Sequence, residues 1–124
     1  MSQKKILIVE DDIQTQRVYH NKLTSEGYAV VLAATGKEGV FTAKKIRPDL
    51  VILDIMLPGT GMNGFDVLEN MKKDQELKNI PVLVLTNLDT EERVAKEIGA
   101  NEYLVKANVS IDEVAERVNK RLQK

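Results

Sequence analysis

The most constraining feature of the sequence is the run Leu50-Val51-Ile52-Leu53, which an acid, Asp54, follows directly. Four consecutive apolar residues, two of them β-branched, are typical of a short strand that is buried on both faces of a sheet. Because an ionised carboxylate is costly to bury, we expect Asp54 to mark the carboxyl end of this strand and to face a crevice.

Similar stretches predict four further strands, and helical patterns lie between them. With the run before Asp54, the expected strands are residues 6–9, 28–33, 50–53, 81–86 and 103–105. Apolar residues recur near the helical period after each strand. The expected helices run from residue 13 to a stop at Gly27, from the segment 35–39 to Pro48, through 65–71, from 89 to 98, and from 110 to 122.

Helix starts are marked by residues that commonly cap helices. Asp12 directly precedes the first helix, so we interpret it as an N-cap rather than a metal ligand. Asp89 with Glu92, and Ser110 with Glu113, have the spacing of a capping box. We therefore expect the fourth and fifth helices to begin at these pairs.

This alternation predicts an α/β fold, a single (βα)5 doubly wound domain with a five-stranded parallel sheet. Each parallel crossover needs a helix and is right-handed, so helices cover both faces. The strand order 2-1-3-4-5 is common in such folds, and we expect it here. Since 124 residues suffice for one domain with a core but not for two, we expect residues 1–124 to form one domain, with no output domain.

Polar residues close four of the predicted strands. Glu10 and Asp11 follow the first, Asp54 follows the third, Thr86 ends the fourth, and Lys106 follows the fifth. Because the carboxyl ends of parallel strands share one side of a sheet, we expect these residues to surround one crevice.

The predicted crevice has chemistry that suits a metal and a phosphoryl group. Three carboxylates beside a single ammonium would repel one another unless a cation joined them. Oxygen ligands without His or Cys favour magnesium, which is usually held by carboxylates together with a phosphate. Lys106 and the Thr86 hydroxyl would then hold an anion, which suits a phosphoryl group transferred to a carboxylate.

Composition excludes several other classes. Lys and Arg total 18 against 19 Asp and Glu, so the net charge of -1 gives no argument for nucleic acid or an anionic membrane as a partner. The absence of cysteine excludes disulfides and thiolate chemistry. No signal-peptide core or membrane span is visible, and we expect a cytoplasmic protein.

Together, Glu10-Asp11, Asp54, Thr86 and Lys106 resemble the receiver domain of two-component response regulators, over essentially the whole chain. The resemblance implies that Asp54 accepts a phosphoryl group from a histidine kinase in a magnesium-dependent reaction. It implies that Asp11 and Asp54 ligate the metal, that Glu10 helps through water, and that Lys106 holds a phosphoryl oxygen.

The resemblance also implies further roles and partners. The backbone carbonyl of Met56 would be another metal ligand, and Thr86 and Tyr103 would form the pair that rearranges on phosphorylation. The helix after Thr86, the fifth strand and the last helix would signal to a downstream protein. The phosphodonor would be a sensor histidine kinase or a phosphotransfer protein, and the domain a monomer or a phosphorylation-dependent dimer. Such a regulator assists its own phosphorylation and dephosphorylation but is not a turnover enzyme.

The sequence departs from the family pattern in three places. Thr60-Gly61 is interpreted as a two-residue insertion in the loop beside Asp54, so we expect a longer loop there. Asn87 follows Thr86 where the family usually has a small residue. Ala107 replaces the usual proline after Lys106, which predicts either a trans peptide with a rearranged loop or a strained cis bond.

Two other functions stay open at this stage. One is an aspartyl-nucleophile phosphatase or a flavin protein on a similar sheet. A phosphatase of that type would carry its nucleophile and acid after the first strand, where this chain has Glu10-Asp11-Asp12, and a nucleotide-binding protein would carry a glycine-rich loop there. The other is a scaffold that no longer responds to phosphorylation, which the departures at Asn87 and Ala107 make conceivable.

Overall fold

The computed structural model describes residues 3–57 and 61–123. Within them, five strands span Lys5–Val9 (β1), Ala29–Ala33 (β2), Leu50–Leu53 (β3), Val82–Thr86 (β4) and Glu102–Val105 (β5). The helices span Ile13–Ser25 (α1), Gly36–Ile46 (α2), Gly64–Lys73 (α3), Glu92–Ile98 (α4) and Ile111–Leu122 (α5), and a short 3-10 helix spans Lys106–Asn108. The strand bounds agree with the expected ones to within one residue.

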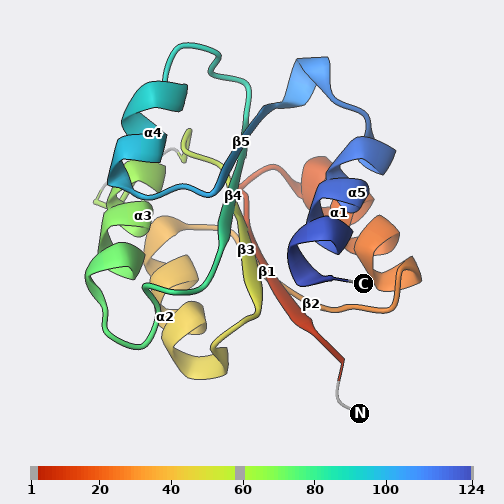
Figure 1. The fold of residues 1–124 in the computed structure, drawn as a ribbon, viewed down its shortest axis with the longest axis horizontal. Coiled ribbons are helices and arrows are strands. Elements are labelled where there is room, and N and C mark those ends of the chain that lie inside the picture. The colour runs from red at the N-terminus through yellow and green to blue at the C-terminus, as the bar shows by residue number, and fades with distance from the viewer. Residues whose placement is uncertain (1–2, 58–60, 124) are drawn as a thin grey trace.

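The strands form one parallel sheet in the order β2-β1-β3-β4-β5, as predicted. The helices α2, α3 and α4 lie on one face of the sheet and α1 and α5 on the other (Figure 1). The doubly wound (βα)5 prediction is thereby confirmed.

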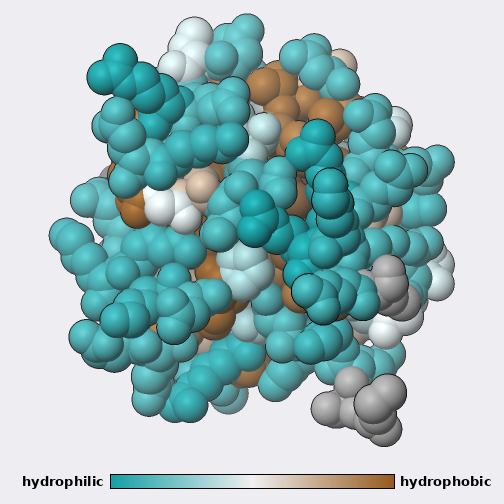
Figure 2. Space-filling view, in the orientation of Figure 1, coloured by the Kyte–Doolittle hydropathy of each residue, from teal (hydrophilic) through white to brown (hydrophobic). Residues whose placement is uncertain are grey.

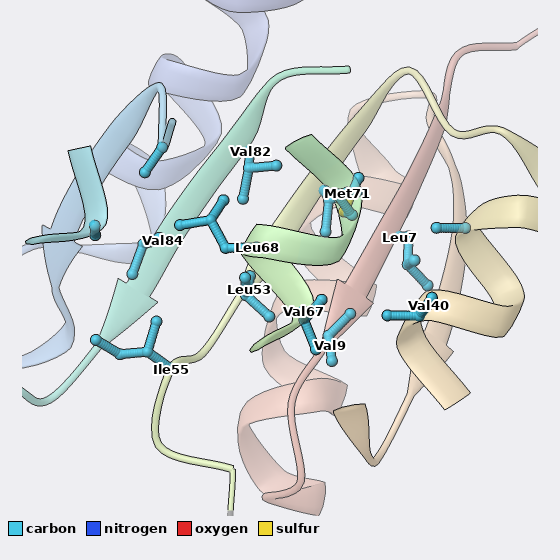
Figure 3. Close-up of a cluster of buried hydrophobic side chains, with 14 of the residues drawn as sticks. Leu7, Val9, Val40, Leu53, Ile55, Val67, Leu68, Met71, Val82 and Val84 are labelled. Atoms are coloured by element: carbon cyan, nitrogen blue, oxygen red, sulfur yellow. The ribbon is translucent and has the colours of Figure 1, made fainter. Parts of the chain in front are cut away.

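Alternate residues of each strand supply a separate core on each face. In β1, Leu7 and Val9 pack toward α2 and α3, whereas Ile6 and Ile8 pack toward α1 and α5. Figure 3 shows the first of these clusters, with Leu53 and Val84 facing the side chains of α3. All four residues of β3 are buried, as the unbroken apolar run predicts.

Helix caps confirm two of the three expected helix starts. Asp12 caps α1 by accepting the Thr15 N–H, and Ser110 forms the predicted capping box of α5 with Glu113. The prediction for α4 is wrong, because this helix begins at Glu92 and its N-cap residue, Glu91, makes no side-chain capping bond.

Candidate functional site

The carboxyl ends of the strands bring the predicted residues together. Val9 pairs with Leu53 across β1 and β3, so the residues that follow, Glu10 and Asp54, lie side by side. The Asp54 N–H donates to the Val9 carbonyl at 3.0 Å, which continues the ladder by one bond. Both acids are thus fixed by the sheet itself rather than by flexible loops.

The start of α3 also packs against the Asp54 segment. A Cβ atom added to Gly64 would lie 2.5 Å from the Asp54 carbonyl oxygen and 2.2 Å from the Ile55 Cα. Any larger residue would therefore push this helix away from the acid.

Lys106 joins the two buried acids. Its Nζ donates to Glu10 Oε1 at 2.5 Å and to Asp54 Oδ2 at 2.9 Å. Glu10 is 4% exposed and Asp54 5% exposed, so these bonds are largely shielded from water. Burial disfavours the ammonium, yet the bonds to Asp54 and Glu10 outweigh it and raise the pKa of Lys106.

Backbone groups bind the remaining oxygens of both acids. Asp54 Oδ1 accepts the Met56 N–H at 2.9 Å, and Glu10 Oε2 accepts the Asp12 N–H at 3.1 Å. Desolvation nevertheless raises the pKa of Glu10, because it exceeds the lowering by the bonds to Lys106 and Asp12, and the nearby Asp54 charge adds to it.

Three carboxylates gather at this point in a way that fits a divalent cation. Glu10, Asp11 and Asp54 each offer an oxygen, and these oxygens lie within 4.8 Å of one another. Asp11 is exposed and has no side-chain hydrogen bond or ion pair among the described residues. The donor set consists of hard oxygens, which magnesium prefers.

Thr86 and Tyr103 hold the same residue, Leu88, in the segment that follows β4. The Thr86 side chain is fully buried and its Oγ1 accepts the Leu88 N–H at 3.4 Å. The Tyr103 hydroxyl donates to the Leu88 carbonyl at 2.5 Å, and Tyr103 as a residue is 8% exposed. Desolvation raises the pKa of Tyr103. Thr86 and Tyr103 are thus connected through the backbone of one residue, Leu88.

The departures from the family pattern have different outcomes. The Lys106–Ala107 peptide is trans and begins the 3-10 helix Lys106–Asn108, which agrees with the first of the two expected alternatives. Asn87 is exposed. Of the expected insertion Thr60-Gly61, Thr60 lies outside the described residues. Gly61 is described and has a positive φ of 103°.

Comparison with known proteins decides the family. A model of the response regulator receiver domain matches residues 6–119. The chain belongs to this family. The receiver domain is 46% identical over 104 residues to the probable transcriptional regulatory protein SilR of Salmonella typhimurium, covering 82% of this chain and 44% of that protein. It is 38% identical over 121 residues to the transcriptional regulatory protein HprR of Escherichia coli K12, covering 96% of this chain and 52% of that protein.

Solved receiver domains share the whole fold. The BeF3-activated receiver domain of Klebsiella pneumoniae RstA superposes with a TM-score of 0.87 at 28% identity, over 98% of this chain and 100% of that one. The receiver domain of sensor histidine kinase PA1611 from Pseudomonas aeruginosa, with magnesium coordinated in its active-site cleft, has a TM-score of 0.87 at 26% identity, over 99% and 100% of the two chains. The chain spans about half the length of the curated relatives it matches.

The receiver domain contains site contacts that sequence reasoning did not find. The side-chain amide of Gln16 donates to the Glu10 carbonyl, and Leu88 links Thr86 to Tyr103. The only sequence signal for Gln16 is its place in the first turn after the acids, and nothing in the sequence marks Leu88.

No helix within residues 3–57 and 61–123 is long and apolar enough to cross a membrane.

Proposed function

We propose that this receiver domain accepts a phosphoryl group on Asp54 from the phosphohistidine of a histidine kinase or phosphotransfer protein. The observation that carries the proposal is the pairing of buried Asp54 with Lys106 beside the two further acids, Glu10 and Asp11. Receiver domains of response regulators interact with histidine kinases, which supports this class of donor.

Magnesium is the proposed cofactor. Asp11, Asp54 and the Met56 carbonyl would hold the ion directly, and Glu10 would help through water. When bound, it would neutralise charge on the phosphoryl oxygens and on the acids.

Asp54 would supply the nucleophile. One of its carboxylate oxygens bonds to phosphorus as the bond between phosphorus and the donor's imidazole nitrogen breaks, and the released imidazole takes up a proton. Lys106 Nζ, which donates to Asp54 Oδ2 in the unphosphorylated domain, would then donate to a phosphoryl oxygen. The Thr86 hydroxyl accepts the Leu88 N–H, so its own proton is free to be donated to another phosphoryl oxygen. Later attack by water returns the carboxylate and inorganic phosphate.

Exposed apolar side chains near the site support docking of the donor there. Ile13 is 64% exposed and Val18 40% exposed on α1, and Ile111 is 39% exposed at the start of α5. Val18, Ile111 and Lys106 line one cavity of about 270 Å³. Figure 2 shows a hydrophobic area over the segment between β5 and α5, on a mostly hydrophilic face. A donor helix with its own apolar side chains would suit this surface.

The signal would leave through α4, β5 and α5. Thr86 lies at the site and Tyr103 lies on β5, and both hold Leu88, so a shift of Thr86 toward a phosphoryl group would change the support of the segment before α4. The partner that binds this surface would be a downstream protein. The domain would act in the cytoplasm as a monomer or as a phosphorylation-dependent dimer.

Acetyl phosphate with magnesium tests the proposal. The expected result is a mass increase of one phosphoryl group that requires Mg²⁺ and that Asp54→Asn abolishes. The matched control is Asp74→Asn, because Asp74 follows α3 at the opposite end of the sheet and its Oδ1 can still accept the Glu76 N–H. Modification of Asp54→Asn to the wild-type level would contradict the proposal.

Two further measurements separate the alternatives. Sustained turnover of free phosphomonoesters would favour a phosphatase. A downstream partner whose Kd ignores phosphorylation would favour a scaffold.

A further inference from the structure

The peptide group that joins Glu10 to Asp11 is held by a residue outside the acidic cluster. The Gln16 side-chain amide, in the first turn of α1, donates to the Glu10 carbonyl. The Gln16 backbone N–H donates to the Asp12 carbonyl at 3.0 Å. One residue therefore contacts the turn before and after Asp11.

Asp11 depends on this backbone more than its neighbours do. The Glu10 and Asp54 carboxylates are each held by Lys106 and by a backbone N–H. The Asp11 carboxylate has no such bond among the described residues, so only its backbone sets its direction. The peptide plane before Asp11 is the one whose oxygen Gln16 binds.

We infer that Gln16 is a positioning residue for the divalent cation, acting through the Glu10–Asp11 peptide. Its side chain is half-buried, which partly shields the bond from competition by water. Without that bond the peptide can rotate, and Asp11 spends less time within reach of the oxygens of Glu10 and Asp54. This inference rests on the proposed magnesium site.

Gln16→Met tests the inference because methionine has a similar length and helix propensity but no N–H donor. The measurement is the Kd for Mg²⁺ of the unphosphorylated domain, by isothermal titration calorimetry. We expect the Kd to rise roughly 3- to 10-fold, the loss that one hydrogen bond typically causes. The Mg²⁺ concentration that gives half the maximal rate with acetyl phosphate should rise similarly, while the rate at saturating Mg²⁺ stays the same.

Asn21→Met is the matched control, because Asn21 is an exposed amide on the same helix. Its Kd should equal that of the wild type. Gln16→Ala provides a second variant if Gln16→Met does not fold, and urea denaturation in EDTA reports the stability of each.

Three outcomes would overturn the inference. If Gln16→Met binds Mg²⁺ as the wild type does, Gln16 has no positioning role and the proposed function stands. If Asn21→Met weakens binding equally, the effect belongs to α1 as a whole. If the wild type binds no Mg²⁺, the proposed metal site fails and the role of Gln16 fails with it.

Discussion

Lys106 and Lys72 are both half-buried, but they lie at opposite ends of the sheet and bind different oxygens. At the carboxyl end, Lys106 bonds to the carboxylates of Glu10 and Asp54. At the amino end, Lys72 donates to the Ile80 carbonyl at 3.0 Å and to other neutral oxygens, including Asn101 Oδ1 at 3.3 Å.

The pKa shifts of the two lysines go in opposite directions. Burial alone lowers the pKa of Lys72, whereas the carboxylates raise the pKa of Lys106 in spite of its burial. Neutral carbonyl oxygens have little affinity for a second cation, whereas carboxylates also attract a metal ion. Lys72 therefore stabilises loops at the amino end, and Lys106 binds carboxylates that a metal ion could also bind at the carboxyl end.

The largest expected effect comes from Lys106→Met. The buried acids would face each other without a cation, so we expect the free energy of unfolding in EDTA to fall by about 2 to 4 kcal/mol. Mg²⁺ should restore more stability to this variant than to the wild type, since it would replace the missing charge. Urea denaturation with and without Mg²⁺ measures both effects, and a loss that Mg²⁺ leaves unchanged would contradict the expectation.

A smaller loss is expected for Lys72→Met. The variant leaves carbonyls such as that of Ile80 without their donor, which costs about 1 to 2 kcal/mol, and Mg²⁺ should recover none of it. Lys73→Met is the control, because Lys73 is exposed on the same helix. If Lys72→Met and Lys106→Met lost equal stability and responded equally to Mg²⁺, the contrast between the two ends would fail.

The smallest expected effect is the pH dependence of Glu10→Gln. The pKa of Glu10 is raised above its ordinary value of 4.5, chiefly by desolvation, so the folded domain binds this proton more tightly than the unfolded chain does. The contribution of Glu10 to stability therefore falls as the pH rises from about 4.5 through the folded pKa. We expect Glu10→Gln to gain stability relative to the wild type over this range in EDTA, measured by urea denaturation. A difference that does not change with pH would show that ionisation of Glu10 is not its cause.

The sheet and the residues at its carboxyl end could be predicted because both follow from local patterns. Short apolar runs predict strands, and the polar residue that ends each run is brought to a common side by parallel pairing. Asp54 and Lys106 lie far apart in the chain, yet the position of each follows from the strand that it ends.

The start of α4 could not be predicted in the same way. The segment before α4 makes a long-range contact, because the Tyr103 hydroxyl donates to the Leu88 carbonyl 15 residues away, and the helix begins at Glu92 rather than at the predicted cap residue Asp89. A local capping pattern carries no information about such a contact. Likewise, the hydrogen bond from the Gln16 side chain to the Glu10 carbonyl depends on the rotamer of Gln16 on α1. A sequence pattern does not predict that rotamer.

The position of β5 at the edge of the sheet has a consequence for folding. Lys106 follows this strand, and among the strands of residues 3–57 and 61–123 β5 pairs with β4 alone. The acids after β1 and β3 can therefore be brought together by their own strands before the last one docks. Until β5 pairs, Glu10 and Asp54 lack their bonds to Lys106, and two carboxylates without that cation repel each other. The strand that completes the sheet is therefore also the one that brings the neutralising ammonium to its charged end.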